Sequence, residues 1–274
     1  MDVDPREALP APLRHGIDQT IAAERLEGWQ PTAGHIRALV DLIGDAVTFG
    51  DYLASYRARY PPAPAEPARN YRRVFRRARP YLVPGTTLLR NNFGADSHDM
   101  LADLEFVATA GRMAGWHRRL AEGEVSGDEL DVRGIHQQMF ADVYPWAGNY
   151  RVTELRRGDM VFAWRSTVAQ LMARVEDSAR RLAVNGSGME AAALAYELAR
   201  LYADYNHVHP FREGNGRTGT LMLHTVMALA GRQLDLSTFS RDEWYSASRD
   251  SMPFRRDGRA NHRPFLPLFV RALG

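Results

Sequence analysis

The chain has 274 residues, of which 45% are hydrophobic and 25% are charged, and its formal net charge at pH 7 is +2. This length allows one large domain or a main domain with a small partner. The charge is too small to indicate nucleic-acid binding, so we expect no nucleic-acid partner. No run of about 18 apolar residues could span a bilayer, and the first residues lack the apolar segment of a signal peptide. We therefore expect no membrane partner and a cytoplasmic location.

Two residue types are absent. The chain contains no cysteine, and all 35 of its basic Lys or Arg positions are arginine. The first absence excludes disulfides, thiolate metal sites and cysteine nucleophiles. The second excludes the lysine of a P-loop and the lysine of a Schiff base. If this protein binds nucleotide phosphates, it must use arginine, backbone N–H groups and a metal ion.

A proline-rich segment divides the chain. Four of the seven residues from Pro61 to Pro67 are proline, which excludes a helix there and favours an extended linker. We predict a helical module over residues 1–60, a linker over residues 61–70 and a larger domain over residues 71–274. The arginines between Arg69 and Arg79 are interpreted as a solvated helix face rather than a nucleic-acid site, because regular aromatic interleaving is missing.

The N-terminal module reads as three helices. The first is expected from about Ile17 to Glu27 and ends at Gly28, since glycine accepts the left-handed conformation after a helix. The second begins after Thr32, a good N-cap residue. The third is expected from about Phe49 to Tyr60. A module of this size has too little apolar surface to be stable alone, so we expect it to dock on another part of the chain.

The larger domain also shows helical spacing. Apolar residues recur at helical intervals around Leu104, from Leu194 to Tyr205 and after Gly216. We expect strands only in one hairpin, formed by residues 150–155 and 160–163 around a turn at 156–159. The predicted fold is therefore mainly α with one β-hairpin.

The most informative segment runs from His209 to Arg217 and reads His-Pro-Phe-Arg-Glu-Gly-Asn-Gly-Arg. It lies between two predicted helices, so its glycines and the helix start can form an anion site of backbone N–H groups. His209 can accept a proton near neutral pH, and Glu213 suits Mg²⁺. Arg217 can bind phosphate oxygens. Together these groups indicate phosphate-transfer chemistry.

Some of these segments also have simpler, purely structural interpretations. A tight turn with a histidine cap could explain part of the nonapeptide, but chance is a poor explanation for so many constrained positions. His207 is interpreted as a helix-terminal residue rather than a metal ligand. Trp146 is interpreted as a core residue, and Gly186-Ser187-Gly188 as an interhelical loop, because no strand precedes it.

The nonapeptide resembles the signature of the Fic family, and the resemblance extends over roughly residues 80–272. It includes Val-Tyr-Pro-Trp-Ala-Gly-Asn-Tyr-Arg at 143–151, Gly-Asp-Met-Val-Phe-Ala at 158–163 and the start of the domain at 88–94. The resemblance implies a helical bundle with a hairpin, called the flap, over residues 71–274. It also implies transfer of AMP from Mg²⁺-ATP to a Ser, Thr or Tyr hydroxyl of a target protein, with ATP and Mg²⁺ as cofactors.

The resemblance assigns a role to each residue of the signature. His209 would deprotonate the target hydroxyl, Glu213 would hold Mg²⁺, and Phe211 would anchor the loop in the core. The anion site would consist of Gly214, Asn215 and Gly216, with Arg217 on the β-phosphate side. The flap residues that would align the target by strand pairing are Met160, Val161, Phe162 and Ala163.

The first module resembles the small antitoxins that inhibit Fic toxins. Their inhibitory helix has the pattern (Ser/Thr)-x-x-x-Glu-(Gly/Asn), which Glu27 and Gly28 match, although Ala23 stands at the Ser/Thr position. The resemblance implies an intramolecular antitoxin-like module that inhibits its own catalytic domain.

One position departs from the family pattern. A second arginine usually follows the first by three residues, where it binds the γ-phosphate and pairs with the inhibitory glutamate. Thr220 stands at that position. Glu27 then needs another cation, for which Arg212 and Arg249 are candidates, or inhibition is steric, or the module is only a stabilising lid. The departure leaves open phosphotransfer of the Doc type, transfer of another nucleotide, or a catalytically silent toxin–antitoxin-like binding module.

Overall fold

The computed structural model describes residues 4–60, 79–158 and 160–274. These residues form ten α-helices, several short 3-10 turns and one two-stranded sheet, which confirms the mainly α fold with one hairpin. The helices are α1 (Ala11–Leu26), α2 (Ala33–Ile43), α3 (Phe49–Arg57), α4 (His98–Ala121), α5 (Val132–Phe140), α6 (Val168–Asn185), α7 (Ala191–Val208), α8 (Asn215–Leu229), α9 (Arg241–Asp250) and α10 (Leu266–Leu273). The strands are β1 (Arg156–Arg157) and β2 (Met160–Val161).

The three predicted N-terminal helices are present as α1, α2 and α3. The first begins earlier than predicted, at Ala11, and is followed by Gly28 with φ of 108°. The hydroxyl of Thr32 accepts a hydrogen bond from the backbone N–H of His35 at 3.2 Å, as expected of an N-cap. The linker predicted at residues 61–70 and most of the arginine cluster at 69–79 lie outside the described residues.

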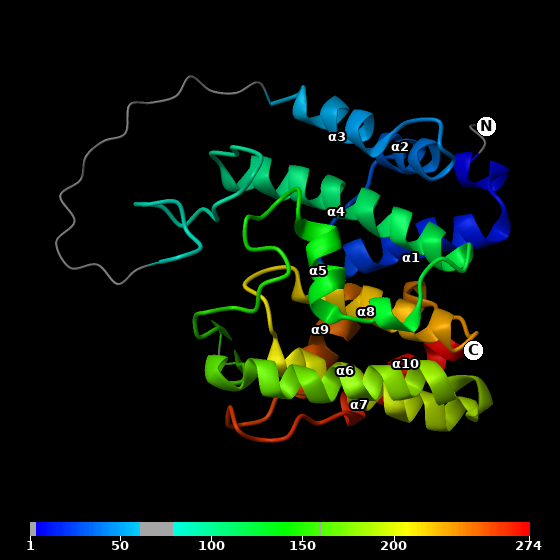
Figure 1. Ribbon diagram of the computed structural model, residues 1–274, viewed down its shortest axis with the longest axis vertical. Coiled ribbons are helices and arrows are strands. Elements are labelled where there is room, and N and C mark those ends of the chain that lie inside the picture. Colours follow the sequence, from blue (N-terminus) through cyan, green and yellow to red (C-terminus); the bar gives the residue numbers. More distant parts are fainter. Residues whose placement is uncertain (1–3, 61–78, 159) are drawn as a thin grey trace.

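Helix α4 is the element around which the N-terminal half is arranged. In Figure 1, α2 and α3 lie on one side of α4 and α1 runs along another, and all three contact it. Helix α1 also contacts α8 and α9. Ile17 and Ala23 of α1 are fully buried in the same core as residues of α4, α7 and α8. The first helix is therefore an integral part of the packing.

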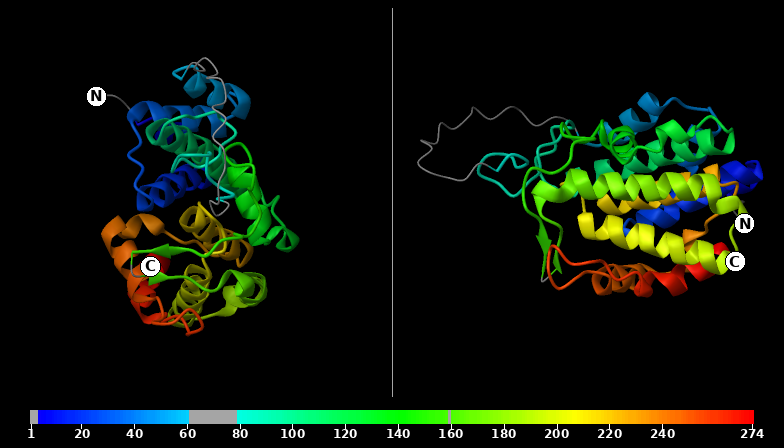
Figure 2. Two further views of the ribbon diagram at one scale, coloured as in Figure 1. Left: turned by 90° about the vertical axis from the view of Figure 1, so that its left-hand side faces the viewer. Right: turned by 60° about the horizontal axis from the view of Figure 1, so that its bottom comes forward.

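The second half of the chain forms a layer of helices that carries the nonapeptide. Helices α6, α7 and α8 pack against one another, and α10 lies against α7 (Figure 2). Helix α7 ends at Val208 and α8 begins at Asn215, so residues 209–214 form the short loop between them. The end of α1 reaches this loop from the N-terminal half.

The hairpin is present, but its strands differ from the prediction. Residues 150–155 were expected to form the first strand, whereas β1 consists of Arg156–Arg157, which had been placed in the turn. Arg151 explains the difference: its backbone N–H donates to the carbonyl of Pro210 at 2.8 Å, so this stretch binds the loop instead of a strand. At the other side, the N–H of Ala163 donates to the carbonyl of His207 at 3.0 Å, which ends β2.

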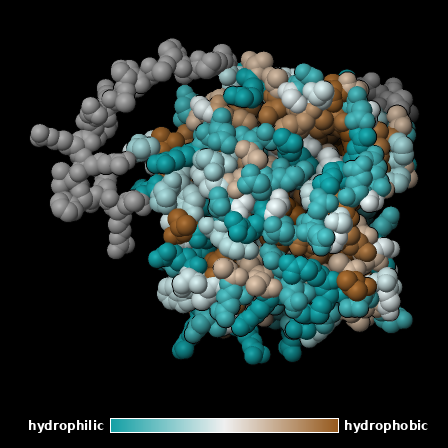
Figure 3. All heavy atoms as spheres, viewed as in Figure 1, coloured by the Kyte–Doolittle hydropathy of each residue, from teal (hydrophilic) through white to brown (hydrophobic). Residues whose placement is uncertain are grey.

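Smaller predictions are also met. Trp146 is buried and stacks on Tyr144, as expected of a core residue. Residues 186–188 form a 3-10 turn between α6 and α7. Figure 3 shows a face on which polar residues predominate and hydrophobic residues occur in separate small groups. Within the described ranges, no helix has the length and apolar character that a membrane crossing requires.

Candidate active site

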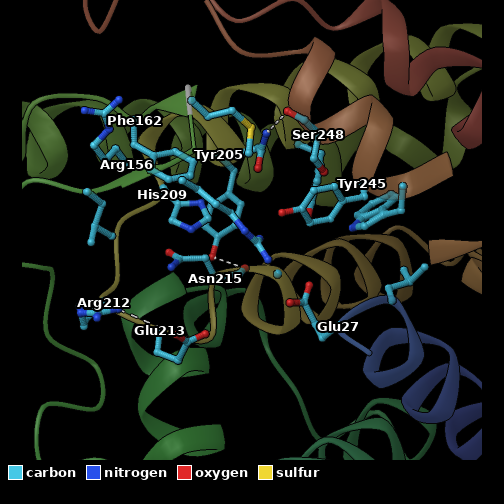
Figure 4. A pocket seen from close by; sticks show the side chains of 18 of the residues that line it. Glu27, Arg156, Phe162, Tyr205, His209, Arg212, Glu213, Asn215, Tyr245 and Ser248 are labelled. Atoms are coloured by element: carbon cyan, nitrogen blue, oxygen red, sulfur yellow. Dashed lines mark hydrogen bonds and ion pairs between the residues drawn. The ribbon is translucent and has the colours of Figure 1, made fainter. Parts of the chain in front are cut away.

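A cavity of about 280 Å³ lies where the loop 209–214 meets the ends of α1, α9 and the hairpin. Among its lining residues are His209, Glu213, Asn215 and Gly216 of the nonapeptide, together with Glu27. In Figure 4 the Glu27 carboxylate points from the end of α1 toward the start of α8, and the hydroxyl of Tyr245 faces the same space. The structure thus gathers most of the predicted site residues around one cavity.

His209 is held in an unusual backbone conformation at the end of α7. Its φ is 47°, in the left-handed region that few non-glycine residues adopt. Its ring stacks on Phe162 of the hairpin, with ring centroids 3.8 Å apart. Burial, with the charges of Arg151 and Arg157, lowers the pKa of His209 to about 3. The imidazole is therefore neutral at pH 7 with a lone pair available, although burial in this closed arrangement makes it a weaker base than a solvated histidine.

The loop is closed from within by Asn215. Its side-chain oxygen accepts from the backbone N–H of Phe211 at 2.9 Å, and its amide nitrogen donates to the carbonyl of Phe211 at 3.0 Å. Phe211 is fully buried and stacks on His136 with centroids 3.8 Å apart, as expected of a loop anchor. Both ends of the Asn215 side chain therefore shape the loop, and the place of this residue in the anion site remains a prediction.

Glycine is required at the turn into α8. Gly214 has φ of 77°, and a Cβ there would lie 2.2 Å from the ring of Phe140. Gly216 follows in the first turn of α8, where backbone N–H groups lack partners within the helix. A Cβ on Gly216 would lie 1.8 Å from Oε1 of Glu27. The Glu27 carboxylate therefore rests on the helix start that was predicted to bind phosphate, where the helix dipole favours an anion.

Arg217 points away from the cavity. It is buried, forms an ion pair with Glu105 of α4, and donates to the hydroxyl of Thr109 at 3.1 Å. Glu24 of α1 lies 3.8 Å from the same guanidinium. Burial raises the pKa of Glu24 to about 7, although Arg217 lowers it. The predicted role of Arg217 in phosphate binding remains a prediction, because in this conformation the side chain is held by carboxylates.

Glu213 lies on the cavity wall. Its Oε1 accepts from the backbone N–H of Gly214 at 3.2 Å, and Arg212 lies 4.0 Å from its Oε2. Burial raises the pKa of the Glu213 carboxyl. Nowhere in the described ranges do three or more His, Cys, Asp or Glu side chains gather as a metal cluster. The Glu213 carboxylate alone could hold Mg²⁺, since in nucleotide sites this ion takes most of its other ligands from phosphates and water.

The position of the missing arginine is occupied by a buried hydroxyl. The Thr220 side chain donates to the carbonyl of Arg217 at 2.9 Å and supplies no charge. The two arginines suggested as partners of Glu27 do not pair with it: Arg249 binds Asp250 at 2.9 Å, and Arg212 lies 4.0 Å from Glu213. Across the described residues, Glu27 has no ion pair within 4.0 Å.

Comparison with known proteins places this site in a family. The model of the Fic/DOC family matches residues 126–227. The probable protein adenylyltransferase y4lH of Sinorhizobium fredii is 31% identical over 160 residues, which are 58% of this chain and 80% of that protein. The chain belongs to the Fic/DOC family. The probable protein adenylyltransferase Fic of Escherichia coli is 27% identical over 174 residues, 62% of this chain and 82% of the relative.

Solved structures agree with the fold of a Fic/DOC protein. The BepC protein of Bartonella tribocorum, crystallised with bound AMPPNP, has a TM-score of 0.55 at 21% identity and covers 70% of this chain and 95% of that one. A Fic domain-containing signalling protein from Bacteroides thetaiotaomicron has a TM-score of 0.57 at 13% identity and covers 95% of this chain and 84% of that one. The family model begins at residue 126, so residues 1–60 lie outside its match.

Two residues that hold the Fic loop in place were not assigned a role from the sequence. Arg151 is buried and donates to the carbonyls of His209, Val208 and Ala163, at 2.8, 3.2 and 2.6 Å. His136 accepts from the N–H of Gly148 at 2.8 Å, so its other nitrogen donates to the carbonyl of Glu213 at 3.1 Å. Arg151 lies in the stretch 143–151 that resembles the Fic family, and this was the only feature of the sequence that pointed to a role for it. No feature of the sequence pointed to His136.

Proposed function

We propose that this Fic/DOC protein transfers AMP from ATP to a Ser, Thr or Tyr hydroxyl of a target protein, and that the end of α1 inhibits it in cis. The observation that carries the proposal is the Glu27 carboxylate lying on the helix start beside His209. An anion site that a carboxylate can occupy is suited to a phosphate, and a neutral histidine lines the same cavity. Curated relatives at 26–31% identity are named protein adenylyltransferases.

The reaction requires the site to transfer one proton and to exchange one bond at phosphorus for another. His209 would take the proton of the target hydroxyl as its oxygen forms a bond to the α-phosphorus of ATP. The bond from that phosphorus to the oxygen bridging to the β-phosphate breaks, and pyrophosphate leaves. The N–H groups at the start of α8 would stabilise the charge on the transferred phosphoryl group. Glu213 would hold Mg²⁺, which when bound neutralises charge on the phosphates.

The hairpin would present the target. Val161 and Met160 of β2 pair only with β1, so the outer edge of this short strand remains open within the described residues. An extended target segment could add to that edge through backbone hydrogen bonds. Phe162 would then fix the distance between the target segment and the imidazole, because the Phe162 ring stacks directly on His209.

Inhibition follows from the position of Glu27. A phosphate group could not occupy the space against Gly216 while Oε1 of Glu27 lies 1.8 Å from where a Cβ on that residue would be. In this proposal residues 1–60 act as the inhibitory module and residues 61–70 as the linker that keeps it at high effective concentration near residues 71–274. Full activity then requires the end of α1 to withdraw.

A second candidate is transfer of phosphate instead of AMP. Thr220 favours it, because the side chain at this position is neutral and bonds within its own helix. The two reactions label a target differently: AMP transfer retains the α-phosphate of ATP, whereas phosphotransfer retains only the γ-phosphate. A silent binding module would retain neither.

The test uses ATP labelled at the α-phosphate or at the γ-phosphate, incubated with purified full-length protein and bacterial lysate. We expect Glu27→Gly to label a target from α-labelled ATP at least tenfold more than the native chain, and His209→Ala in that background to abolish labelling. Glu122→Gly is the matched control, because Glu122 is also a helix C-cap residue followed by a left-handed glycine. Label only from the γ-phosphate would establish the second candidate, and no label from either would overturn both.

A further inference from the structure

A triphosphate bound in this cavity would need positive charge near its outer phosphates. In a helix, residue i+4 lies one turn from residue i on the same face, so position 220 is one turn behind Gly216. Thr220 is buried there and its hydroxyl binds the carbonyl of Arg217. Arg217 itself is engaged by Glu105 and Glu24. No side chain of α8 in this arrangement therefore brings positive charge into the cavity.

Arg241, at the first position of α9, is placed to supply that charge. It lines the cavity together with Glu27, Gly216 and Glu213. Its guanidinium carbon lies 3.5 Å from where a Cβ on Gly28 would be, and its Nε donates to the carbonyl of Leu26 at 3.3 Å. Among the residues that the structure describes, no carboxylate lies within 4.0 Å of Arg241. Its charge is thus uncompensated by an ion pair.

The neighbours of Arg241 define which part of a bound nucleotide it would meet. The carboxylate of Glu27 covers Gly216, and Gly28, the next residue, faces the Arg241 guanidinium. Gly216 and Arg241 line the same cavity, with the end of α1 between them and in contact with both. An oligophosphate with one group at Gly216 would therefore extend its next groups toward Arg241 once the end of α1 has left.

The other cavity arginines are less suited to this role. Arg212 lies 4.0 Å from Glu213 on the opposite side of the loop. Arg156 and Arg157 belong to the exposed hairpin, where Arg156 donates to the carbonyl of Gly158 at 3.3 Å and Arg157 lies 4.6 Å from the ring centroid of Tyr245. Among the described cavity arginines, only Arg241 donates a hydrogen bond to the backbone at the end of α1, the segment that covers the start of α8.

We propose that Arg241 is a phosphate-binding residue that replaces the arginine missing at position 220 and holds the outer phosphates of the nucleoside triphosphate. The proposal rests on the proposed function, because it assigns a ligand to the same site. In the inhibited state the guanidinium binds the Leu26 carbonyl, and in the active state it binds the nucleotide. The Arg241 guanidinium thus stabilises either the docked end of α1 or the bound triphosphate, but not both at once.

The test compares nucleotides that differ only in phosphate number. In the full-length Glu27→Gly background, the dissociation constants of ATP and AMP are measured by calorimetry with Mg²⁺, with and without Arg241→Gln. We expect Arg241→Gln to weaken ATP binding about tenfold or more, as for loss of a charged hydrogen bond, and to change AMP binding less than twofold. Arg241→Lys should recover part of the ATP affinity, since it retains the charge.

Arg249→Gln is the matched control, because Arg249 lies on the same helix, is exposed and pairs with Asp250. It should change neither constant. Unchanged ATP affinity in Arg241→Gln, or an equal loss for ATP and AMP, would overturn the inference. If the Glu27→Gly protein binds ATP more tightly than the native chain but Arg241→Gln does not change that affinity, only this inference fails. If Glu27→Gly binds no nucleotide, the proposed function fails with it.

Discussion

At the scale of single residues, the decisive contact is the one between Glu27 and Gly216. The side chain of one residue fills the space that the absence of a side chain on the other leaves open. This explains why a glycine stands in the first turn of α8, where alanine would otherwise be the better helix former by about 1 kcal/mol. The contact couples the end of α1 to the anion site through steric fit as well as charge.

Gly216→Ala should therefore have different effects in two backgrounds. In the native chain we expect little or no gain in the free energy of unfolding, because the new methyl group must displace the carboxylate at the flexible end of the Glu27 side chain. With Glu27→Ala, the same change should be stabilising. Urea unfolding of the four proteins in this double-mutant cycle measures the coupling. Equal effects of Gly216→Ala in both backgrounds would show that Glu27 does not rest on this glycine.

The sequence predicts which residues lie near the cavity, but it does not predict where every side chain points. His209, Glu213 and Gly216 surround one cavity, because a short loop between two helices leaves them little choice. Arg217 was predicted to face the phosphates, yet its side chain is long and the buried Glu105 of α4 lies more than 100 residues away in sequence. Such a long-range ion pair has no local sequence signal.

At the scale of the elements, the end of α7 and the hairpin are joined by Arg151. The last carbonyls of a helix have no partner within it, and here the guanidinium of Arg151 satisfies those of Val208 and His209. It also holds the carbonyl of Ala163, just after β2. The position of the hairpin over His209 therefore depends on one buried side chain.

Arg151→Ala should lower the free energy of unfolding by about 3 kcal/mol or more, because it leaves several buried carbonyls without donors. Arg151→Lys should recover little, since an ammonium group lacks the planar arrangement of five donors. The exposed Arg165 at the other side of the hairpin provides a control, and Arg165→Ala should change stability by less than about 0.5 kcal/mol. Thermal and urea unfolding measure all three, and a mild effect of Arg151→Ala would contradict this role.

The hairpin also shows why strand boundaries were missed. Residues 150–155 have the composition of a strand, but the backbone of Arg151 bonds to Pro210 and its guanidinium reaches across the end of α7. Tertiary contacts thus overrode the local preference. The helices were predicted better, because caps such as Thr32 and the spacing of apolar residues are local signals.

At the scale of the whole molecule, the N-terminal helices belong to the core. Tyr52 of α3 donates to the carbonyl of Val107 in α4 at 3.0 Å, and Thr109 of α4 donates to Glu24 of α1 at 2.7 Å. Gln19 of α1 accepts from the backbone N–H of Leu236 at 2.8 Å. The module predicted from the sequence therefore has a broad, specific interface with the rest of the chain.

Deleting residues 1–60 should expose this interface. We expect the truncated protein to unfold at a temperature at least 10 °C lower than the full chain or to self-associate, because buried apolar surface and hydrogen bonds are lost together. Thermal unfolding and size-exclusion chromatography check this expectation. A truncated protein as stable as the full chain would show that α1 only rests on the surface. For this reason Glu27→Gly is the better activating change.

Buried histidines make stability depend on pH. Burial lowers the pKa of His117 to about 3, whereas its ordinary value is 6.5. Between these values the unfolded chain binds a proton that the folded chain does not, so this group lowers stability as the pH falls from 6.5 toward 3, by about 1.4 kcal/mol per pH unit. Glu24, whose pKa is raised to about 7, acts in the opposite direction, since its contribution is lost as the pH rises from 4.5 to 7.

His117→Phe removes this proton and retains a ring against His224, whose centroid lies 4.8 Å away. We expect the variant to gain stability relative to the native chain as the pH is lowered from 6.5 to 4, measured by urea unfolding at several pH values. Parallel pH profiles of the two proteins would contradict the buried neutral histidine.

The central claim is that Glu27 and the phosphates of ATP compete for the start of α8. Calorimetric titration of the full-length native chain and of Glu27→Gly with Mg²⁺-ATP tests this competition most directly, with Glu122→Gly as control. We predict that Glu27→Gly binds ATP at least tenfold more tightly than the native chain, while Glu122→Gly binds it as the native chain does. Equal affinities of the native chain and Glu27→Gly would contradict the claim.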